Sequence, residues 1–340
     1  MSGLLASERP LSAAYDVALM DLDGVTYEGR APIEHAAAGA RAARESGLRL
    51  FFVTNNASRP PQDVADQLSS LGIPADRDEV YSSAMAAVQL AVKRHGRGAR
   101  VLAIGGPGLL EAAREGGLEL AEDADDRPLA VLQGFRESIC WADLTEAAYA
   151  INAGAEYIAT NLDTTLPRER GMAVGNGSLV AAVVSATGVQ PLSAGKPEPE
   201  IFRLAAERAG AHNPIAVGDR LNTDIAGAVA SRLPSLHVLT GVSSARDVVL
   251  APPSQRPTYL GLDLRDLAAP HPPVTHGEGW WACRGARARA LGGHLELERV
   301  GSLELHDSVH VSVDEYRALA AAAWASGVRH CPRLAVVEEL

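Results

Sequence analysis

Aromatic residues, lysine and cysteine are scarce in this sequence, and each shortage narrows what the protein can be. Phe, Trp and Tyr make up 4% of the 340 residues, so Val, Leu, Ile and Ala must fill the interior. The three cysteines, Cys140, Cys283 and Cys331, lie far apart with no CxxC pair, which argues against a disulfide framework or a zinc ribbon. This use of cysteine fits a reducing cytoplasm best.

Long apolar runs are also missing. No uninterrupted stretch approaches the roughly 18 apolar residues that span a bilayer, and the first residues lack the basic and apolar segments of a signal peptide. Acidic residues outnumber basic ones by 42 to 31, and the net charge of −11 argues against nucleic acid or a membrane as a partner. We therefore expect a soluble, unexported protein in which any bound phosphate needs a local site.

The composition that is present belongs to a globular protein, with 47% hydrophobic and 21% charged residues. At roughly 150 residues per domain, the length predicts two domains or one domain with a large insertion. Strand-length apolar runs alternate with Ala-rich helical segments, which predicts an α/β fold with a doubly wound, Rossmann-like parallel sheet. The expected core strands are 17–20, 48–53, 215–217 and 236–239, and the expected core helices are 36–45, 62–71, 198–209 and 224–231.

This core is expected to be interrupted and extended. Residues 83–190 have strands of their own, so we expect an inserted α/β domain between core residues 1–82 and 191–270. Six prolines between residues 252 and 273 predict a linker, because consecutive prolines serve neither a central strand nor a helix interior. Residues 277–340 are expected to form a small α+β domain, with strands at 295–299, 308–313 and 334–337 and a helix at 314–325.

Two acids follow the first predicted strand, in the segment MDLDG. Asp21 and Asp23 lie at the carboxyl end of that strand, where an open α/β sheet binds its ligands. Two carboxylates this close do not both ionise readily without a cation, so the pair predicts a bound metal or one raised pKa. The alternative is a solvated turn that contains two acids by chance.

A hydroxyl and two amides follow the second predicted strand. Thr54, Asn55 and Asn56 carry donors that can hold a phosphate oxygen. The same segment, TNNAS, also has the composition of a simple turn, because Asn and Ser bend chains for local reasons. Taken alone, this segment leaves both interpretations open.

Lysine is rare enough for its position to be informative. The 31 basic residues include only two lysines, Lys93 and Lys196. Lys196 precedes a helix that begins with proline, and the positive end of a helix dipole disfavours a cation unless an anion lies between them. A compact charge directed at an anion accounts for both features, and a chance surface lysine is the alternative.

Acids return after a later predicted strand, in the segment GDRLNTD. Asp219 ends that strand, and Asp224 lies near the start of the next helix, where it can also serve as a favourable N-terminal charge. A Mg²⁺ ion held by few protein oxygens, with waters and a substrate phosphate completing its octahedron, would reconcile the acids with the nearby cation and donors.

In this order, DLDG, TNN, GKP and GDRLNTD resemble the four signature motifs of the haloacid dehalogenase superfamily of phosphohydrolases, across residues 15–265. In the inserted segment, IATNLDTTLP and GNGSLVAAV are similar to the signature of the type C2 cap in the p-nitrophenylphosphatase-like subfamily. Within it, the likeness is greatest to glycerol 3-phosphate and phosphoglycolate phosphatases, notably the mycobacterial type with its C-terminal appendage. That likeness implies a truncated acetyltransferase-like fold for the appendage.

The resemblance implies a role for each motif residue. Asp21 would attack the phosphoryl group, and Asp23 would protonate the leaving alkoxide and later deprotonate water. The resemblance also implies that Thr54 and Lys196 bind the phosphoryl oxygens. The implied ligands of Mg²⁺ are the Asp21 carboxylate, the Asp23 backbone carbonyl and Asp219, with Asp224 either in direct contact or behind them.

We expect the residues that select the substrate to lie in the cap, because the core binds only the phosphate that all candidate substrates share. Asn161 and Asp163 are candidate substrate-binding residues beside Asn55 and Asn56, although they can instead only brace their loop. Leu166 stands where pyridoxal phosphate phosphatases have His, which favours a small leaving group.

The expected partner is therefore a small phosphorylated metabolite, with glycerol 3-phosphate first. Phosphoglycolate, a sugar phosphate and pyridoxal phosphate remain alternatives. So does a regulatory binding protein with a vestigial site, and the sequence leaves a homo-oligomer open.

Overall fold

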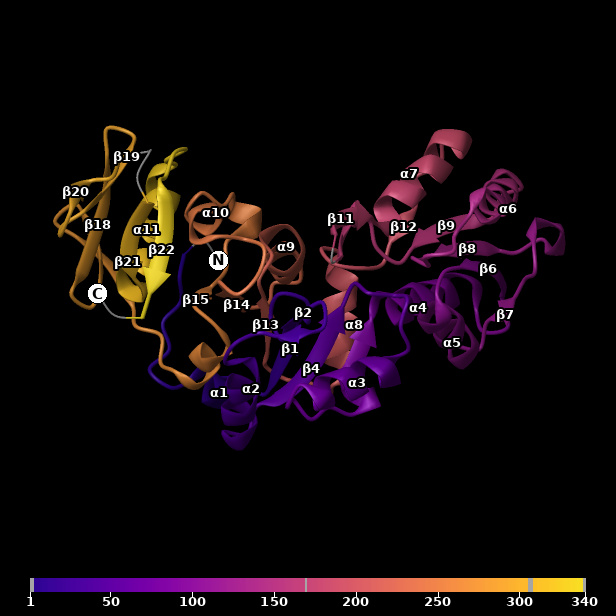
Figure 1. The fold of residues 1–340 in the computed structure, drawn as a ribbon, viewed down its shortest axis with the longest axis horizontal. Coiled ribbons are helices and arrows are strands. Elements are labelled where there is room, and N and C mark those ends of the chain that lie inside the picture. Colours follow the sequence, from indigo (N-terminus) through magenta and orange to yellow (C-terminus); the bar gives the residue numbers. More distant parts are fainter. Residues whose placement is uncertain (1–2, 169, 305–307, 339–340) are drawn as a thin grey trace. The chain divides into compact units, whose positions relative to one another are not determined.

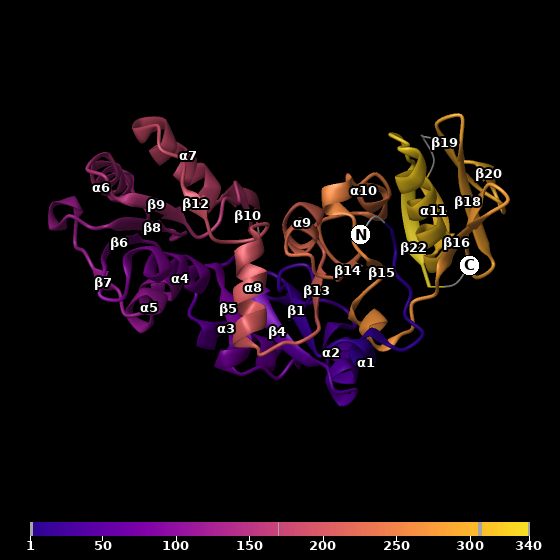
Figure 2. The same cartoon turned by 180° about the vertical axis from the view of Figure 1, so that it is seen from behind.

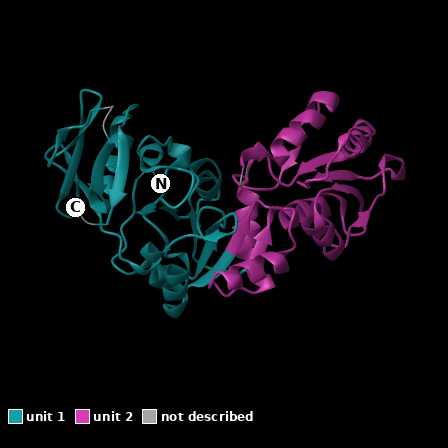
Figure 3. Cartoon of the chain, viewed as in Figure 1, with its two compact units in different colours: residues 1–51, 208–340 teal, residues 52–207 magenta. Residues whose placement is uncertain are grey.

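The computed structural model describes residues 3–168, 170–304 and 308–338 (Figure 1). Two compact units are present: residues 1–51 with 208–340 form unit 1, and residues 52–207 form unit 2 (Figure 3). These units differ from the domains that the order of the sequence motifs suggests. The predicted domain boundaries therefore stay a prediction. Among the described residues, no helix has both the length and the apolar character needed to cross a bilayer.

Unit 1 is built on a parallel sheet. Its strands are neighbours in the order β15 (Tyr259–Gly261), β14 (Ser235–Val238), β13 (Pro214–Gly218) and β1 (Val17–Met20). All residues of β1 and β14 are buried, as expected for strands covered on both faces. Figures 1 and 2 show α1 (Leu11–Ala14) and α2 (Ala36–Glu45) on one side of the sheet, and α9 (Ala226–Ala230) and α10 (Ala245–Val249) on the other.

The predicted linker is wrong, because part of that segment belongs to this sheet. β15 lies between Pro257 and Pro270 and pairs in parallel with β14, with Leu236 opposite Tyr259. The prolines flank the strand without interrupting it, and β15 is an edge strand, where proline is tolerated. The turn η5 (Leu264–Ala268) then packs on α2 so closely that a Cβ on Gly39 would lie 2.5 Å from the Leu264 carbonyl carbon.

The C-terminal appendage contains a five-stranded antiparallel sheet, a helix and a pair of parallel strands. The sheet has the order β16 (Val274–Gly277), β17 (Trp280–Cys283), β18 (Ala286–Leu291), β19 (His294–Leu297) and β20 (Gly301–Ser302). α11 (Val313–Ser326) follows β21 (Ser308–Ser312), which pairs with β22 (Arg333–Val337). The predicted helix and three strands are confirmed within one to two residues, but β16, β17, β18 and β20 were missed. β18 reads ARARAL, with little of the β-branched character typical of strands.

The appendage and the parallel sheet share one hydrophobic core. Leu319 and Trp324 of α11 belong to the same buried cluster as Leu221, Val248 and Leu260. The Trp324 indole nitrogen also donates a hydrogen bond of 2.9 Å to the carbonyl of Val248 on α10. The appendage is therefore packed into unit 1 and is not a separately folded tail.

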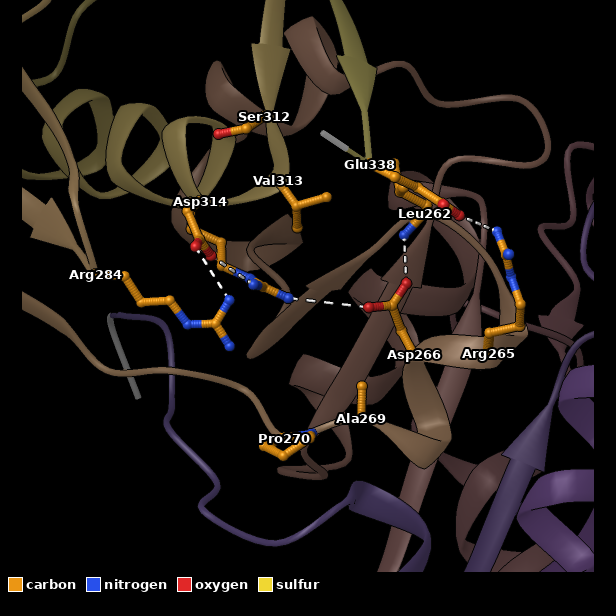
Figure 4. Close-up of a pocket in the computed structure, with 11 residues that line it drawn as sticks. Leu262, Arg265, Asp266, Ala269, Pro270, Arg284, Ser312, Val313, Asp314 and Glu338 are labelled. Carbon is orange, nitrogen blue, oxygen red and sulfur yellow. Dashed lines mark hydrogen bonds and ion pairs between the residues drawn. The ribbon is translucent and has the colours of Figure 1, made fainter. Parts of the chain in front are cut away.

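A buried arginine reinforces this junction. Arg317 on α11 is 6% exposed and donates to Asp314 Oδ1 at 3.0 Å and to the carbonyl of Leu260 in β15 at 3.0 Å. Its Nη2 lies 4.0 Å from Asp266 Oδ1, and burial raises the pKa of Asp266. Arg317, Asp314 and Asp266 line a pocket of about 340 Å³ in which Arg284 pairs with Asp314 (Figure 4). None of the candidate catalytic residues lines it.

Unit 2 begins within strand β4 (Arg49–Thr54), whose last three residues pair in parallel with β5 (Val80–Ser82). Helix α3 (Pro61–Ser70) packs on β5, and α8 (Pro199–Arg208) closes the unit. A second parallel sheet has the order β12 (Leu192–Ser193), β9 (Glu156–Ala159), β8 (Ala130–Gln133), β6 (Arg100–Ile104) and β7 (Glu119–Leu120).

Helices cover both faces of this second sheet. Figures 1 and 2 show α4 (Ser83–His95) and α5 (Pro107–Glu115) on one face, and α6 (Trp141–Asn152) and α7 (Asn176–Thr187) on the other. An antiparallel hairpin of β10 (Thr165–Arg168) and β11 (Gly171–Val174) follows the loop that the sequence associates with substrate choice. The predicted α/β fold with doubly wound parallel sheets is confirmed.

Replacing Trp324 with Ala is expected to lower the free energy of unfolding by about 3–5 kcal/mol, because it opens a cavity in the shared core and removes the indole hydrogen bond. Trp141, which is 78% exposed, offers the matched control, and its replacement with Ala should cost less than about 0.5 kcal/mol. Urea unfolding measures both. Equal losses would contradict the packing of the appendage on the sheet.

Stability is also expected to fall in acid because of His271. Its Nε2 donates to the carbonyl of Asp266 at 3.0 Å, its Nδ1 accepts from Arg317 at 3.4 Å, and burial lowers its pKa from 6.5 to about 4. The unfolded chain binds a proton that the folded chain excludes between these values. His271 should therefore contribute a fall of roughly 1 kcal/mol per pH unit in the free energy of unfolding as the pH drops from 6.5 to 4. Urea titrations of His271→Asn should give a shallower slope; an unchanged slope would contradict this assignment.

Candidate active site

Three acids gather at the carboxyl ends of two neighbouring strands of unit 1. Asp21 directly follows β1 and Asp219 directly follows β13, and these strands are paired with Met20 opposite Val217. Asp224 lies in the wide helical turn η3 (Leu221–Ile225) that leads into α9. One carboxylate oxygen from each acid lies within 4.8 Å of the other two. The parallel register thus brings together residues that are about two hundred positions apart in sequence.

The backbone holds the Asp219 carboxylate in place. The Val242 N–H donates to Asp219 Oδ2 at 2.6 Å. A Cβ on Gly24 would lie 2.5 Å from the Asp219 carboxyl carbon, and one on Gly241 would lie 2.1 Å from Oδ2. Gly24 also has a positive φ of 86°, which favours glycine. Glycine at both positions is therefore required for the acid to occupy this position.

Asp224 is fixed in a similar way. Its Oδ2 accepts from the Arg220 N–H at 3.1 Å, and a Cβ on Gly218 would lie 2.2 Å from the Asp224 Cβ. Asp224 and Asp219 are both 1% exposed, whereas Asp21 is half-buried. Burying negative charge is costly unless positive charge or hydrogen bonds offset it, so two buried acids beside a third suit a bound cation.

Asp23 differs from these three acids. It is exposed, and its carboxylate does not join the group among the residues that the structure describes. Its backbone forms a bridge with Tyr27, where β2 (Tyr27–Glu28) and β3 (Ala31–Pro32) make a small hairpin. An accessible carboxylate is compatible with proton transfer at a reacting group, which is the role that the family resemblance implies for Asp23.

Sequence reasoning missed a buried histidine behind Asp219. His237 in β14 donates from Nε2 to the Asp219 carbonyl at 2.9 Å, since a carbonyl can only accept. Burial lowers the pKa of His237 to about 4, so the ring is neutral at pH 7. The only sequence signal was one polar residue inside the otherwise apolar run LHVL.

The donors after β4 lie in unit 2 and form a tight turn. Thr54 Oγ1 accepts from the Asn56 N–H at 3.0 Å. Asn56 Oδ1 accepts from both the N–H and the hydroxyl of Ser58, at 3.0 and 2.7 Å. The following helix, α3, begins only at Pro61. Asn56 thus forms a turn, as one of the two interpretations expected. Its role in substrate binding stays a prediction.

Lys196 is held against the end of β4. It is 4% exposed, and its Nζ donates to the Val53 carbonyl at 3.0 Å, whereas the Lys93 side chain is 70% exposed. The Asn55 side chain pairs with the Lys196 backbone: its Oδ1 accepts from the N–H at 2.7 Å, and its Nδ2 donates to the carbonyl at 3.0 Å. The chance surface interpretation of Lys196 is therefore wrong.

Asn161 and Asp163 join the same group of contacts. Asn161 Nδ2 donates to the Asn55 carbonyl at 2.8 Å, and Asp163 Oδ2 accepts from Asn55 Nδ2 at 3.1 Å. Buried Asn176, which the sequence offered only as part of a signature, donates to the Asn161 carbonyl at 2.8 Å. The structure thus brings together in unit 2 Asn55, Lys196 and both predicted cap residues.

The acids of unit 1 fit a hard divalent cation. Mg²⁺ prefers oxygen ligands, and a cation offsets the repulsion among three carboxylates whose oxygens lie within 4.8 Å of one another. The geometry puts an oxygen of Asp224 in the same group as those of Asp21 and Asp219. These three side chains can hold the ion.

Comparison with known proteins gives consistent matches. Residues 18–119 match haloacid dehalogenase-like hydrolases, and residues 193–267 match a second group of such hydrolases. The chain is 41% identical to the D-glycerol 3-phosphate phosphatase of Mycobacterium tuberculosis, over 93% of this chain and 88% of that protein.

Solved structures agree with these matches. The glycerol phosphate phosphatase of M. tuberculosis in complex with magnesium superimposes with a TM-score of 0.84 and 39% identity, covering 97% of this chain and 96% of that one. The 4-nitrophenylphosphatase of Thermotoga maritima gives a TM-score of 0.70 at 29% identity, covering 76% and 98%. The resemblance predicted from the four motifs is confirmed: the chain belongs to the haloacid dehalogenase-like hydrolases.

Proposed function

We propose that this protein is a Mg²⁺-dependent phosphomonoester hydrolase whose substrate is glycerol 3-phosphate. The observation that carries the proposal is the convergence of Asp21, Asp219 and Asp224 at the ends of paired strands in a haloacid dehalogenase-like hydrolase. Similarity to a glycerol 3-phosphate phosphatase over 93% of the chain supports the choice of substrate. Leu166, in place of a histidine, supports a small leaving group without a ring to stack or pair.

The reaction uses both acids in MDLDG, Asp21 as the nucleophile and Asp23 as the acid and base. A carboxylate oxygen of Asp21 attacks phosphorus, and the bond from phosphorus to the glycerol oxygen breaks as Asp23 donates a proton to that oxygen. Water then attacks the aspartyl phosphate while Asp23 takes its proton, which releases inorganic phosphate and restores Asp21. Two easier displacements replace one difficult displacement.

The remaining motif residues bind and orient the phosphoryl group. The Lys196 ammonium and the Thr54 hydroxyl would hold phosphoryl oxygens, and fixed positive charge stabilises the charge that builds up during transfer. Asp21, Asp219 and Asp224 would hold Mg²⁺, together with the Asp23 carbonyl. The ion would supply further neutralisation of phosphoryl charge when bound.

The proposal extends to the finer organisation of the chain. Residues 83–190 would be a cap of type C2, inserted between core segments 1–82 and 191–270, with 277–340 as the appendage. We place the enzyme in the cytoplasm because of its cysteine usage. The proposed reaction releases glycerol. In a substrate panel, kcat/KM should be lower for phosphoglycolate, sugar phosphates and pyridoxal phosphate than for glycerol 3-phosphate.

Changing Asp21 to Asn is expected to lower kcat on glycerol 3-phosphate at least roughly a thousandfold, because the attacking oxygen is lost while the side-chain shape is kept. Asp125→Asn, at an exposed position in unit 2, is the matched control and should retain full activity. Phosphate release measures the activity of each variant, and thermal melting shows whether it is folded. Full activity in a well-folded Asp21→Asn sample would refute the nucleophile assignment.

Removal of divalent cations with EDTA is expected to abolish hydrolysis, and added Mg²⁺ should restore it, because three uncompensated carboxylates repel the substrate phosphate. Calorimetric titration provides a readout independent of turnover. Asp219→Asn should weaken Mg²⁺ binding at least roughly tenfold, since it removes a charged ligand. Unaltered Mg²⁺ affinity in this variant would contradict the assigned site.

A further inference from the structure

We propose that Asp163 and Asn55 are positioning residues that hold Lys196 in place, and that neither contacts the organic part of the substrate. This inference rests on the proposed function, because it assigns Lys196 to the phosphoryl group. It also separates two roles that the sequence left open for the loop at Asn161 and Asp163. The argument depends only on contacts within unit 2.

Asn55 uses its whole side-chain amide on the protein itself. Oδ1 accepts from the Lys196 N–H at 2.7 Å, and Nδ2 donates to the Lys196 carbonyl at 3.0 Å and to Asp163 Oδ2 at 3.1 Å. The opposite orientation of the amide would set its oxygen against a carbonyl and a carboxylate. The three partners therefore fix the orientation, and both donor hydrogens of the amide are used.

This pairing fixes the Lys196 backbone at two points. Gly195 makes the close approach possible, because a Cβ there would lie 2.6 Å from Asn55 Oδ1. From that fixed backbone the lysine side chain reaches the Val53 carbonyl, one residue before Thr54. Asn55 lies one residue after Thr54, so a short piece of chain sets the position of both phosphoryl-binding side chains.

Asp163 is itself held rigidly. Its N–H donates to Asn161 Oδ1 at 3.2 Å, and its carbonyl accepts from the Gly177 N–H at 2.8 Å at the start of α7. A Cβ on Gly175 would lie 2.3 Å from the Asp163 carbonyl oxygen. Glycines in GNGSLV thus allow the loop to lie against the helix, and the Asp163 carboxylate is directed at Asn55.

The order of contacts is therefore α7, Asp163, Asn55 and Lys196. A carboxylate acceptor strengthens the bond to the Asn55 amide, and loss of that acceptor leaves a donor unsatisfied and the amide less restrained. Loss of this acceptor should weaken binding of the phosphoryl group, which every substrate shares. This effect should not depend on the alcohol that leaves.

The test compares Asp163→Ala with Asp163→Asn on glycerol 3-phosphate and on p-nitrophenyl phosphate. Asp163→Ala should lower kcat/KM roughly tenfold on both substrates alike, and should raise the inhibition constant of inorganic phosphate by a similar factor. Asp163→Asn keeps an acceptor oxygen in the same place and should recover most of the loss. Asp125→Ala is the matched exposed control.

Losses that differ more than roughly fivefold between the two substrates, or an unchanged inhibition constant for inorganic phosphate, would overturn the proposal and make Asp163 a substrate contact. Failure of Asp163→Asn to recover activity would overturn it as well. Wild-type protein that hydrolyses neither substrate would instead refute the proposed function. These failures are therefore distinguishable.

A double-mutant cycle provides a second, independent test. If Asp163 acts only through Asn55, adding Asp163→Ala to Asn55→Ala should cause little further loss of kcat/KM. Additive losses would show separate roles and overturn the proposal. Melting temperatures of all variants show whether they fold. If Asn55→Ala does not fold, the comparison of Asp163→Ala with Asp163→Asn tests the proposal.

Discussion

The mutual repulsion of three carboxylates is the constraint on which the rest of unit 1 depends. Asp21, Asp219 and Asp224 place oxygens within 4.8 Å of one another, an arrangement that costs free energy without a cation. The fold enforces it through the parallel register of β1 and β13, the Val242 N–H, and glycines where any Cβ would collide with an acid. Such a site lowers the stability of the protein when no cation is bound, and it allows the protein to bind a metal ion.

Much of this arrangement was predictable, because strand ends and motif spacing are local in the sequence. The limits of β1 and α2 follow from apolar runs and helical periodicity, and the parallel sheet then implies that Asp21 and Asp219 meet. The pairing of Asn55 with Asp163 was not predictable, since a hydrogen bond across 108 positions leaves no local pattern. β15 was hidden by prolines that flank it.

The appendage shows a different limit of sequence reasoning. Proline-rich sequence before it suggested a tail joined by a linker, yet α11 is buried against both its own sheet and α10. Arg317 and Trp324 bond to carbonyls of the parallel sheet domain, so the two parts stabilise each other. An alanine-rich helix such as α11 permits this, because small side chains allow close approach on every side.

The account rests on the claim that the acids at the ends of β1 and β13 bind one divalent cation. A crystal structure with Mn²⁺ in place of Mg²⁺, read from its anomalous scattering, tests that claim most directly. The account predicts one strong peak at about 2.0–2.3 Å from carboxylate oxygens of Asp21 and Asp219. A saturated crystal with its peak elsewhere, or with no peak between these acids, would contradict it.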